Sequence, residues 1–347
     1  MEKTMHGIVK EQAGPGFTYR EDIPVPVISD DEILFKVHCT ALCGTDVHMY
    51  EWNSWAEKRM TPPVVAGHET CGHVVEVGKN VKGFEVGDMV SVETHGACGK
   101  CYYCTHDLAE LCSNQIMFGV NTNGGFAEYA KVKASSAYKY DPSIPDEMAC
   151  MFEPMGAGVH GVEAGHVEGK TVLIGGLGAI GMTAVKAAKV LGAKTVIATA
   201  RADSKLETAK ALGADFVVNR KTQNLVEEGM KLTDGVGVDV VIEVTGVESS
   251  IHECLKCVHG GGRFVGVGLP TKPVTFDLTE EILYREIEFT GVSGRRIWGT
   301  WDNFAKVMRD PGYKLEYIIG EKFAMKDYEK AIERLRSNAP GKNILYP

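Results

Sequence analysis

The feature of this sequence that most constrains its fold is an alternation of short apolar segments and helical segments that begins at Lys170. The apolar segments are TVLIGG, TVIATA, DFVVN, VDVVIEV and GRFVGVG, and stretches such as AIGMTAVKAAKVLGA and DSKLETAKALGA lie between them. Strands of a parallel sheet are buried on both faces, so they appear as continuous apolar runs of this length. The pattern therefore predicts βαβ units and a doubly wound parallel sheet, which makes the fold class α/β.

A different pattern precedes this region. Between Glu32 and Val90, short apolar runs are interrupted by glycine and proline, which is typical of short strands joined by turns. The 347 residues exceed the roughly 250 to 300 at which a single core stops growing, so we expect two domains. The change of pattern falls near residues 152–168. After Ser293 a tail with amphipathic helical spacing follows, and the pattern alone leaves open which domain it joins.

Composition argues against several classes of partner. The formal net charge is -9, which argues against nucleic acid, since such binding rests on clustered Lys and Arg. The start, MEKTMHGIVKEQAG, has no apolar signal segment, and no stretch approaches the roughly 18 uncharged apolar residues of a membrane span. We therefore expect a cytoplasmic protein without a membrane partner. In that compartment the cysteines are expected to be metal ligands, reactive groups or core residues rather than disulfides.

Four cysteines lie close together in CGKCYYCTHDLAELC, at a C-x2-C-x2-C-x7-C spacing. Four thiolates in one loop can surround a tetrahedral ion, and zinc prefers such ligands in sites without an open position. An iron–sulfur cluster is the alternative, but a ferredoxin-type run would usually carry proline after its last cysteine, where Ser113 stands. The spacing favours a structural zinc that orders the loop, with these ligands: Cys98, Cys101, Cys104 and Cys112.

A second set of metal-ligand candidates lies upstream. Cys43 in CGTDVH and the adjacent His68 and Glu69 in GHETCG are donors that a catalytic zinc uses while it keeps one position open. Glu153, in FEPMGAGVH, adds a carboxylate near the change of pattern, where a cleft between domains is expected. Each residue taken alone is more often a packed core residue, and the combination is what favours a metal site.

Thr45 and His48 follow Cys43 by two and five residues. A hydroxyl and an imidazole at these positions could pass a proton outward from the metal site. The alternatives are a turn residue for Thr45 and a solvated surface histidine for His48, and the neighbouring Cys43 favours the relay.

The strand TVLIG runs directly into a G-x-G-x-x-G motif formed by Gly176, Gly178 and Gly181, with Ile180 inside it. Between a buried strand and a helix, these glycines permit a tight turn, close approach of a pyrophosphate and packing of the helix on the strand. The sequence therefore predicts a dinucleotide site.

The end of the next strand bears on which dinucleotide binds. An NAD site normally carries an acid there for the ribose hydroxyls, but this chain has Ala200 and Arg201, and Lys205 adds a further positive charge. A guanidinium in place of a carboxylate favours a 2′-phosphate, and hence NADP over NAD. The alternative is that Asp203 or another group restores NAD binding.

Together these motifs resemble the zinc-containing medium-chain alcohol dehydrogenases, and within them the L-threonine 3-dehydrogenase branch. The resemblance covers nearly the whole chain and rests on CGTDVHMYEW, the GHE element, VKGFEVGDMV, the cysteine loop, GGFAEYAKV, EPMGAGVH and GVSGRRIWGTWDNF. It implies a GroES-like catalytic domain over residues 1–155 and 295–347, with a structural-zinc lobe at 95–115. It also implies a Rossmann coenzyme domain over 156–294, and homotetramers.

The resemblance further implies two zinc ions per subunit, one structural and one catalytic. The catalytic ion would be bound by Cys43, His68 and Glu69, with Glu153 as a ligand or exchange partner. A small-molecule alcohol or ketone would be the substrate, and a hydride would pass between it and the nicotinamide ring.

Thr45 and His48 match the proton-relay pair of the family, and His95 matches a histidine beside the substrate pocket.

Two departures from the family pattern bear on the substrate. Residues 156–160 read GAGVH where the branch usually reads GNAVH, which removes an amide near the nicotinamide, and Ala200 replaces the expected acid. A polyol, a diol or a bulkier secondary alcohol such as a hydroxysteroid is therefore open beside L-threonine.

Two alternative interpretations concern the metal-ligand candidates. A sensor that binds metal and dinucleotide without catalysis would need no open zinc position, so the Cys43 set argues against it. The segment SSIHECLKCVHGGG contains Cys254 and Cys257 with two histidines, but its pattern indicates a helix that ends at a glycine cap and packs its cysteines against the sheet.

Overall fold

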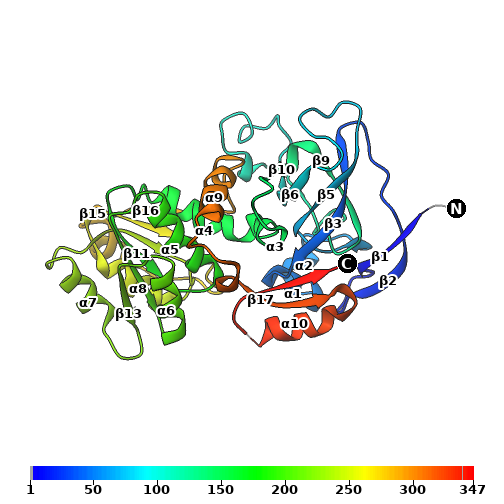
Figure 1. Ribbon diagram of the computed structural model, residues 1–347. Helices are drawn as coiled ribbons and strands as arrows, with labels where there is room; N and C mark the ends of the chain where they lie inside the picture. The colour runs from blue at the N-terminus through cyan, green and yellow to red at the C-terminus, as the bar shows by residue number, and fades with distance from the viewer. Residues whose placement is uncertain (1–2, 338) are drawn as a thin grey trace. The chain divides into compact units, whose positions relative to one another are not determined.

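The computed structural model describes residues 3–337 and 339–347, and the chain divides into two compact units (Figure 1). The first unit comprises Met1–Pro154, Arg296–Trp301 and Ile318–Pro347, and the second comprises Met155–Arg295 and Asp302–Tyr317. In the described part of the chain, the helices are all too short or too polar to span a membrane.

The second unit is built on a six-stranded sheet in which every neighbouring pair is parallel. The spatial order β13-β12-β11-β14-β15-β16 is that of a doubly wound nucleotide-binding sheet, and this confirms the predicted fold class. Leu173, Ile197 and Val241, one from each of three adjacent strands, are fully buried in its core. The strands are β11 (Thr171–Gly175), β12 (Thr195–Ala200), β13 (Phe216–Asn219), β14 (Val238–Glu243), β15 (Val258–Gly266) and β16 (Glu288–Gly291).

Helices follow the strands of this sheet, as the sequence pattern predicts. Helix α5 contacts β11 and β12, and α8 contacts β11, β14 and β15. The helical elements are α4 (Phe152–Ala164), α5 (Ala179–Val190), α6 (Asp203–Ala211), α7 (Leu225–Leu232), α8 (Glu248–Cys257), η3 (Leu278–Leu283) and α9 (Gly299–Arg309), of which α4 and α9 begin in the first unit.

Helix α8 confirms one part of its prediction and corrects another. Cys254 and Cys257 are fully buried in the apolar core against the strands, as expected. The helix does not end at a glycine cap, because Val258 already has extended backbone and begins β15. The following glycines therefore lie within a strand.

The first unit contains a mixed seven-stranded sheet in the order β10-β6-β5-β3-β18-β17, with β9 also paired to β3, and two smaller sheets, β2-β1-β4 and β7-β8. Ile33, Phe35 and Val37 alternate along β3 and are buried in the core of the large sheet. The strands are β1 (Thr4–Lys10), β2 (Thr18–Pro24), β3 (Glu32–Ala41), β4 (Val64–Val65), β5 (Glu69–Val77), β6 (Met89–Val92), β7 (His95–Gly96), β8 (Ile116–Met117), β9 (Tyr129–Lys133), β10 (Ala137–Lys139), β17 (Ile319–Ala324) and β18 (Lys342–Tyr346).

Short helices complete this unit, and the amphipathic tail segment forms α10 beside β17 and β18 (Figure 1). The helical elements are α1 (Gly44–Glu51), α2 (Ser54–Glu57), α3 (Asp146–Ala149), α10 (Tyr328–Arg336), and the single turns η1 (Ala109–Leu111), η2 (Ala134–Ser136) and η5 (Met325–Asp327). One further single turn, η4 (Leu315–Tyr317), belongs to the second unit.

The glycine motif between β11 and α5 shows why glycine is required at two of its three positions. Gly176 has φ +103°, in the region that side chains rarely adopt. A Cβ on Gly181 would lie 2.0 Å from the carbonyl oxygen of Gly176, so only glycine lets the helix pack this closely on the turn. A Cβ on Gly178, the N-cap of α5, would meet no atom within 4 Å, which leaves open space at the start of the helix.

These contacts give the first prediction. Gly181→Ala forces α5 away from the turn, and we expect it to lower the free energy of unfolding by about 1–3 kcal/mol, as overpacking does. Gly178→Ala is the matched control and should leave stability within about 0.5 kcal/mol. Urea unfolding measures both. Equal stability of the two variants would show that the close packing at Gly181 is not required.

Candidate active site

Two paired strands bring three of the predicted metal ligands together. Ala41, the last residue of β3, lies opposite Glu69, the first residue of β5. Cys43 follows β3 as the N-cap of α1, and His68 directly precedes β5. The ligand atoms of Cys43, His68 and Glu69 consequently lie within 4.8 Å of one another. His68 and Glu69 are buried, whereas Cys43 is partly exposed.

Asp46 links two of these residues. Its Oδ2 accepts a hydrogen bond from the backbone N–H of Cys43 at 2.8 Å, and its Oδ1 lies 3.6 Å from Nδ1 of His68. Burial by itself lowers the pKa of His68, but the charges of Asp46 and Cys43 outweigh it and raise that pKa well above its ordinary value. At 3.6 Å the carboxylate of Asp46 therefore acts on the imidazole mainly through its negative charge.

Lys342, on β18, is the counter-ion of Glu69. Its ammonium donates to Oε1 of Glu69 at 2.7 Å and lies 2.5 Å from Oε2. Burial raises the pKa of the Glu69 carboxyl, and the positive charge of Lys342 opposes that rise. Burial would lower the pKa of Lys342, but the charge of Glu69 keeps it raised. Strand pairing brings Lys342 and Glu69 together. Ile344 of β18 lies opposite Ala41 of β3, and Ala41 lies opposite Glu69 on its other side.

The donor set fits a divalent cation. Among the described residues, Nδ1 of His68 and Oδ1 of Asp46 are buried polar atoms without a hydrogen-bond partner. A metal ligand must be deprotonated, and with a thiolate at Cys43 and a neutral imidazole at His68 the set would carry a net negative charge that a divalent ion offsets. One thiolate, one imidazole and one carboxylate around an open position are ligands typical of catalytic zinc.

Glu153, the fourth predicted ligand, lies in a neighbouring group with His95. Their ligand atoms and that of Glu93 fall within 4.8 Å of one another. Glu93 accepts a hydrogen bond from the backbone N–H of His95 at 2.8 Å and from the indole N–H of Trp301 at 3.0 Å. The charge of Glu153 adds to the effect of burial in raising the pKa of Glu69. The two groups therefore interact electrostatically.

The predicted relay residues lie on one short helix. Thr45 and His48 are three residues apart in α1, so they share a face of it. His48 is exposed, and its Nδ1 accepts a hydrogen bond from the side-chain amide of Asn53 at 2.8 Å. The imidazole is thus held at the surface, where it can exchange a proton with water.

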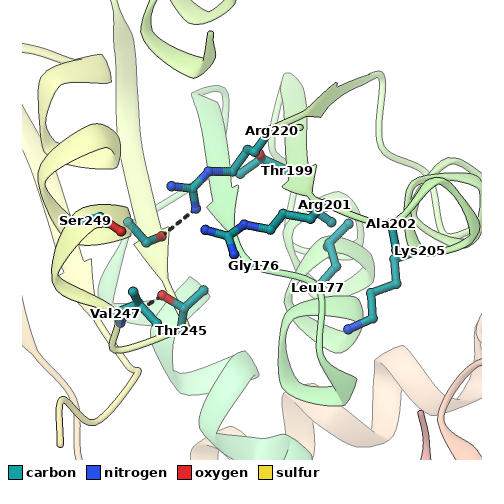
Figure 2. Close-up of a pocket in the computed structure, with 12 residues that line it drawn as sticks. Gly176, Leu177, Thr199, Arg201, Ala202, Lys205, Arg220, Thr245, Val247 and Ser249 are labelled. Carbon is teal, nitrogen blue, oxygen red and sulfur yellow. Dashed lines mark hydrogen bonds between the residues drawn. The ribbon is translucent and has the colours of Figure 1, made fainter. Parts of the chain in front are cut away.

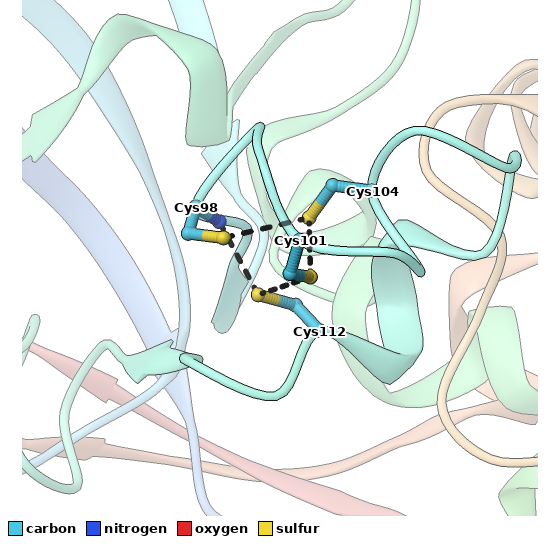
Figure 3. A group of neighbouring side chains, drawn as sticks. All are labelled: Cys98, Cys101, Cys104 and Cys112. Carbon is cyan, nitrogen blue, oxygen red and sulfur yellow. Dashed lines mark hydrogen bonds between the residues drawn. The ribbon is translucent and has the colours of Figure 1, made fainter.

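The cysteine loop forms a compact group of four sulfurs (Figure 3). The Sγ–Sγ distances are 3.9 Å for Cys98–Cys104, 3.5 Å for Cys101–Cys104 and 3.7 Å for Cys101–Cys112. A tetrahedral zinc with bonds of about 2.3 Å separates its sulfurs by about 3.8 Å. The group therefore fits the predicted structural zinc.

Four of the predicted cofactor residues, Gly176, Ala200, Arg201 and Lys205, line a pocket of about 290 Å³ in the second unit (Figure 2). Ala200 ends β12, Arg201 follows it, and Lys205 lies in the first turns of α6. Arg220, directly after β13, also lines the pocket, and Figure 2 shows its guanidinium close to that of Arg201. Gly178, Ile180 and Gly181, the other predicted residues, lie at the start of α5 and outside the lining of this pocket.

Arg220 is held in place by its own contacts. It donates a hydrogen bond to Oγ of Ser250 at 3.0 Å and forms an ion pair with Glu253. Only 11% of its side chain is exposed. A second guanidinium therefore faces this pocket in a fixed position.

Sequence reasoning missed four residues of these sites: Asp46, Glu93, Arg220 and Lys342. Asp46 lies three residues after the N-cap Cys43, and this capping-box spacing was a usable signal. Lys342 is 273 residues from Glu69, so only the strand pairing reveals it.

The comparisons with known proteins identify the family. Residues 29–146 match the family described as "Alcohol dehydrogenase GroES-like domain", and residues 179–310 match "Zinc-binding dehydrogenase". The chain is 42% identical to an L-threonine 3-dehydrogenase of Pyrococcus horikoshii over 99% of both chains.

Two solved structures are similar over almost the full length. A zinc-binding dehydrogenase of Sinorhizobium meliloti 1021 bound to NADP has a TM-score of 0.90 and 28% identity, and covers 100% of both chains. Galactitol-1-phosphate dehydrogenase of Escherichia coli has a TM-score of 0.89 and 26% identity, and covers 99% of this chain and 100% of that one.

The chain therefore belongs to the zinc-binding dehydrogenases, with a GroES-like domain and a Rossmann domain. Within them it is similar to the L-threonine 3-dehydrogenase branch, as the sequence motifs predict. It is a zinc-dependent oxidoreductase that transfers a hydride between a secondary alcohol and a nicotinamide dinucleotide. This confirms the predicted enzyme class and argues against a non-catalytic sensor.

The cysteine loop gives the second prediction. Cys104→Ser removes one of four thiolates, and we expect it to lower the melting temperature by several degrees and to release zinc, because binding energy in such a loop is folding energy. The neighbouring exposed Ser113→Ala is the control and should match wild type. Thermal unfolding and zinc analysis measure both effects. Unchanged zinc content in Cys104→Ser would contradict a four-cysteine site.

Proposed function

We propose that this enzyme oxidises the secondary hydroxyl of L-threonine and that NADP accepts the hydride. The similarity to L-threonine 3-dehydrogenases along the whole chain supports the substrate, at 42% identity for one relative and 39% for another. The arginine-lined pocket supports the cofactor. It is the observation on which the proposal chiefly rests, because guanidinium groups in place of an acid favour a 2′-phosphate.

The chemistry of the pocket favours a phosphate. Ala200 offers no carboxylate to accept ribose hydroxyl protons, and none to repel a 2′-phosphate. Arg201 and Arg220 present planar guanidinium groups, which bind phosphate oxygens in pairs. Lys205 adds a third positive charge, although Figure 2 shows its ammonium apart from the two guanidinium groups.

Cys43, His68 and Glu69 would hold the catalytic zinc, with Glu153 as a ligand or exchange partner. Zinc bound there supplies a Lewis acid that lowers the pKa of an alcohol. The nearby carboxylate of Asp46 would orient the imidazole of His68.

The proton of the alcohol would leave through α1. Thr45 would pass it on, and the exposed imidazole of His48 would release it to water. His95, fixed by Glu93, would bind the substrate beside the metal.

We further propose two zinc ions per subunit, one in the catalytic set and one in the cysteine loop, because both donor sets fit a divalent ion. The first unit would be the catalytic domain and the second the coenzyme domain. Resemblance to the family supports a homotetramer, and the composition supports a cytoplasmic location.

Removal of the thiolate at the metal site gives the third prediction. Cys43→Ala should lower kcat by at least about a thousandfold, since a missing ligand weakens zinc binding, while the Kd for NADPH stays within a factor of about two. Steady-state kinetics and NADPH fluorescence measure the two effects. Cys71→Ala, a buried thiol outside the ligand set, should keep its turnover. Normal turnover in Cys43→Ala would contradict the assignment.

The fourth prediction concerns substrate and cofactor together. L-threonine, polyols, a vicinal diol and a bulky hydroxysteroid are each assayed with NADP and with NAD. We expect the highest kcat/KM for L-threonine with NADP. A higher value for another alcohol would overturn the substrate, and a clear preference for NAD would overturn the cofactor.

A variant shows whether the pocket causes the preference. Arg201→Ala should lower kcat/KM for NADP by about 10- to 100-fold, the size expected for a lost hydrogen bond to a charged group, and leave the value for NAD nearly unchanged. Lys210→Ala, which removes an exposed cation of α6 outside the pocket, is the control. Equal losses with both cofactors would point to a structural role for Arg201.

A further inference from the structure

A group of two histidines and one aspartate lies in the first unit, separate from the metal-ligand sets described above. His38 is on β3, His73 is on β5 and Asp146 begins α3, and their ligand atoms lie within 4.8 Å of one another. Nδ1 of His38 is 3.1 Å from Oδ2 of Asp146, and Nε2 of His73 is 3.3 Å from the same oxygen. Helix α3 packs on both strands, so the sheet itself holds the three side chains together.

Asp146 is fixed on the side that faces away from the histidines. Tyr140 donates a hydrogen bond from its hydroxyl to Oδ1 of Asp146. The buried thiol of Cys71 donates to the backbone oxygen of Asp146 at 3.1 Å. Oδ2 is thereby directed at the imidazoles. Hydrogen bonds of this kind, made to a ligand rather than to the ion, orient carboxylates in metal sites.

The group is open to solvent. The exposed fraction of the side chain is 41% for His38 and 46% for His73, against 13% for Asp146. Both histidines line a pocket of about 350 Å³, so an ion can reach them directly. His6 lines the same pocket but is paired with Glu128 at 3.0 Å. The other lining residues are Lys36, Val37, Tyr346 and Pro347.

We propose that His38, His73 and Asp146 bind a divalent transition-metal ion of the Zn²⁺ or Ni²⁺ type. Metal–nitrogen and metal–oxygen bonds of about 2.0–2.1 Å in a tetrahedral arrangement separate the ligand atoms by about 3.4 Å. The two distances to Oδ2 of Asp146 are close to this value. Two imidazoles with one carboxylate suit Zn²⁺ and Ni²⁺ better than Mg²⁺ or Ca²⁺, which prefer oxygen ligands.

An ion at this position joins β3, β5 and α3. Since it binds the folded chain, it stabilises the fold by mass action, and the melting temperature rises with its concentration. Water occupies the remaining coordination positions, so the affinity is that of a three-ligand site, weaker than that of the four-cysteine loop. The binding does not depend on the proposed substrate or cofactor.

The test first dialyses the enzyme to two zinc ions per subunit, which leaves the weaker histidine–aspartate site empty, and then titrates Ni²⁺ at pH 7.5 and follows binding by calorimetry. Wild type should bind one additional equivalent. His38→Gln and His73→Gln should each weaken that binding by at least tenfold and abolish the rise in melting temperature with added Ni²⁺. Both histidines are exposed, so the variants should fold, and unchanged dehydrogenase activity verifies this.

His6→Gln is the matched control, because it removes a histidine from the same pocket but outside the group. It should bind Ni²⁺ as wild type does. Tyr140→Phe keeps the ring and removes the hydrogen bond to Asp146, and should weaken binding by about tenfold. Absence of an additional equivalent in wild type, or wild-type affinity in His38→Gln and His73→Gln, would overturn the proposal and leave an ordinary histidine–aspartate contact.

Discussion

The antiparallel pairing of β3 with β5 is the constraint on which the rest of the first unit depends. It sets Ala41 opposite Glu69, and so brings Cys43 beside His68 across a gap of 25 residues in the chain. Because side chains alternate between the faces of a strand, a shift of one residue would turn Glu69 to the other face. The alternating apolar residues of β3 prevent that shift, since it would expose the core. Packing in the sheet therefore fixes the positions of the metal-ligand candidates at the end of β3 and the start of β5.

The same pairing explains why buried charge is tolerated here. Glu69 is fully buried, and an isolated carboxylate at such a depth would cost several kcal/mol. Strand β18 adds to the other edge of β3 and supplies Lys342 as its partner. The negative charge of Asp46 likewise favours the charged form of the buried imidazole of His68. Because the ligands come from the ends of paired strands, binding of an ion there would be coupled to the stability of this end of the sheet.

Residues in short motifs were predictable from the sequence, and residues joined by long-range pairing were not. The glycines of the cofactor turn and the four cysteines of the loop follow from local spacing, and the structure brings both sets together as expected. The strands of the parallel sheet were likewise visible as apolar runs. Strand β16 was missed because its four residues, EFTG, are too few and too polar to form such a run. Lys342, Glu93 and Arg220 depend on contacts that no local pattern records.

Arg220 also shows why the cofactor pocket differs from a simple cluster of positive charge. Its guanidinium is held by Ser250 and Glu253 and is mostly buried, whereas Arg201 is exposed. A side chain that is already ordered loses little entropy when a ligand binds, so a fixed guanidinium contributes more selectivity than a mobile one of equal charge. Glu253 partly offsets the charge of Arg220, which lowers attraction for anions at a distance but preserves the directed N–H groups. If NADP binds as proposed, Arg201 would attract its 2′-phosphate and Arg220 would determine where that phosphate is bound.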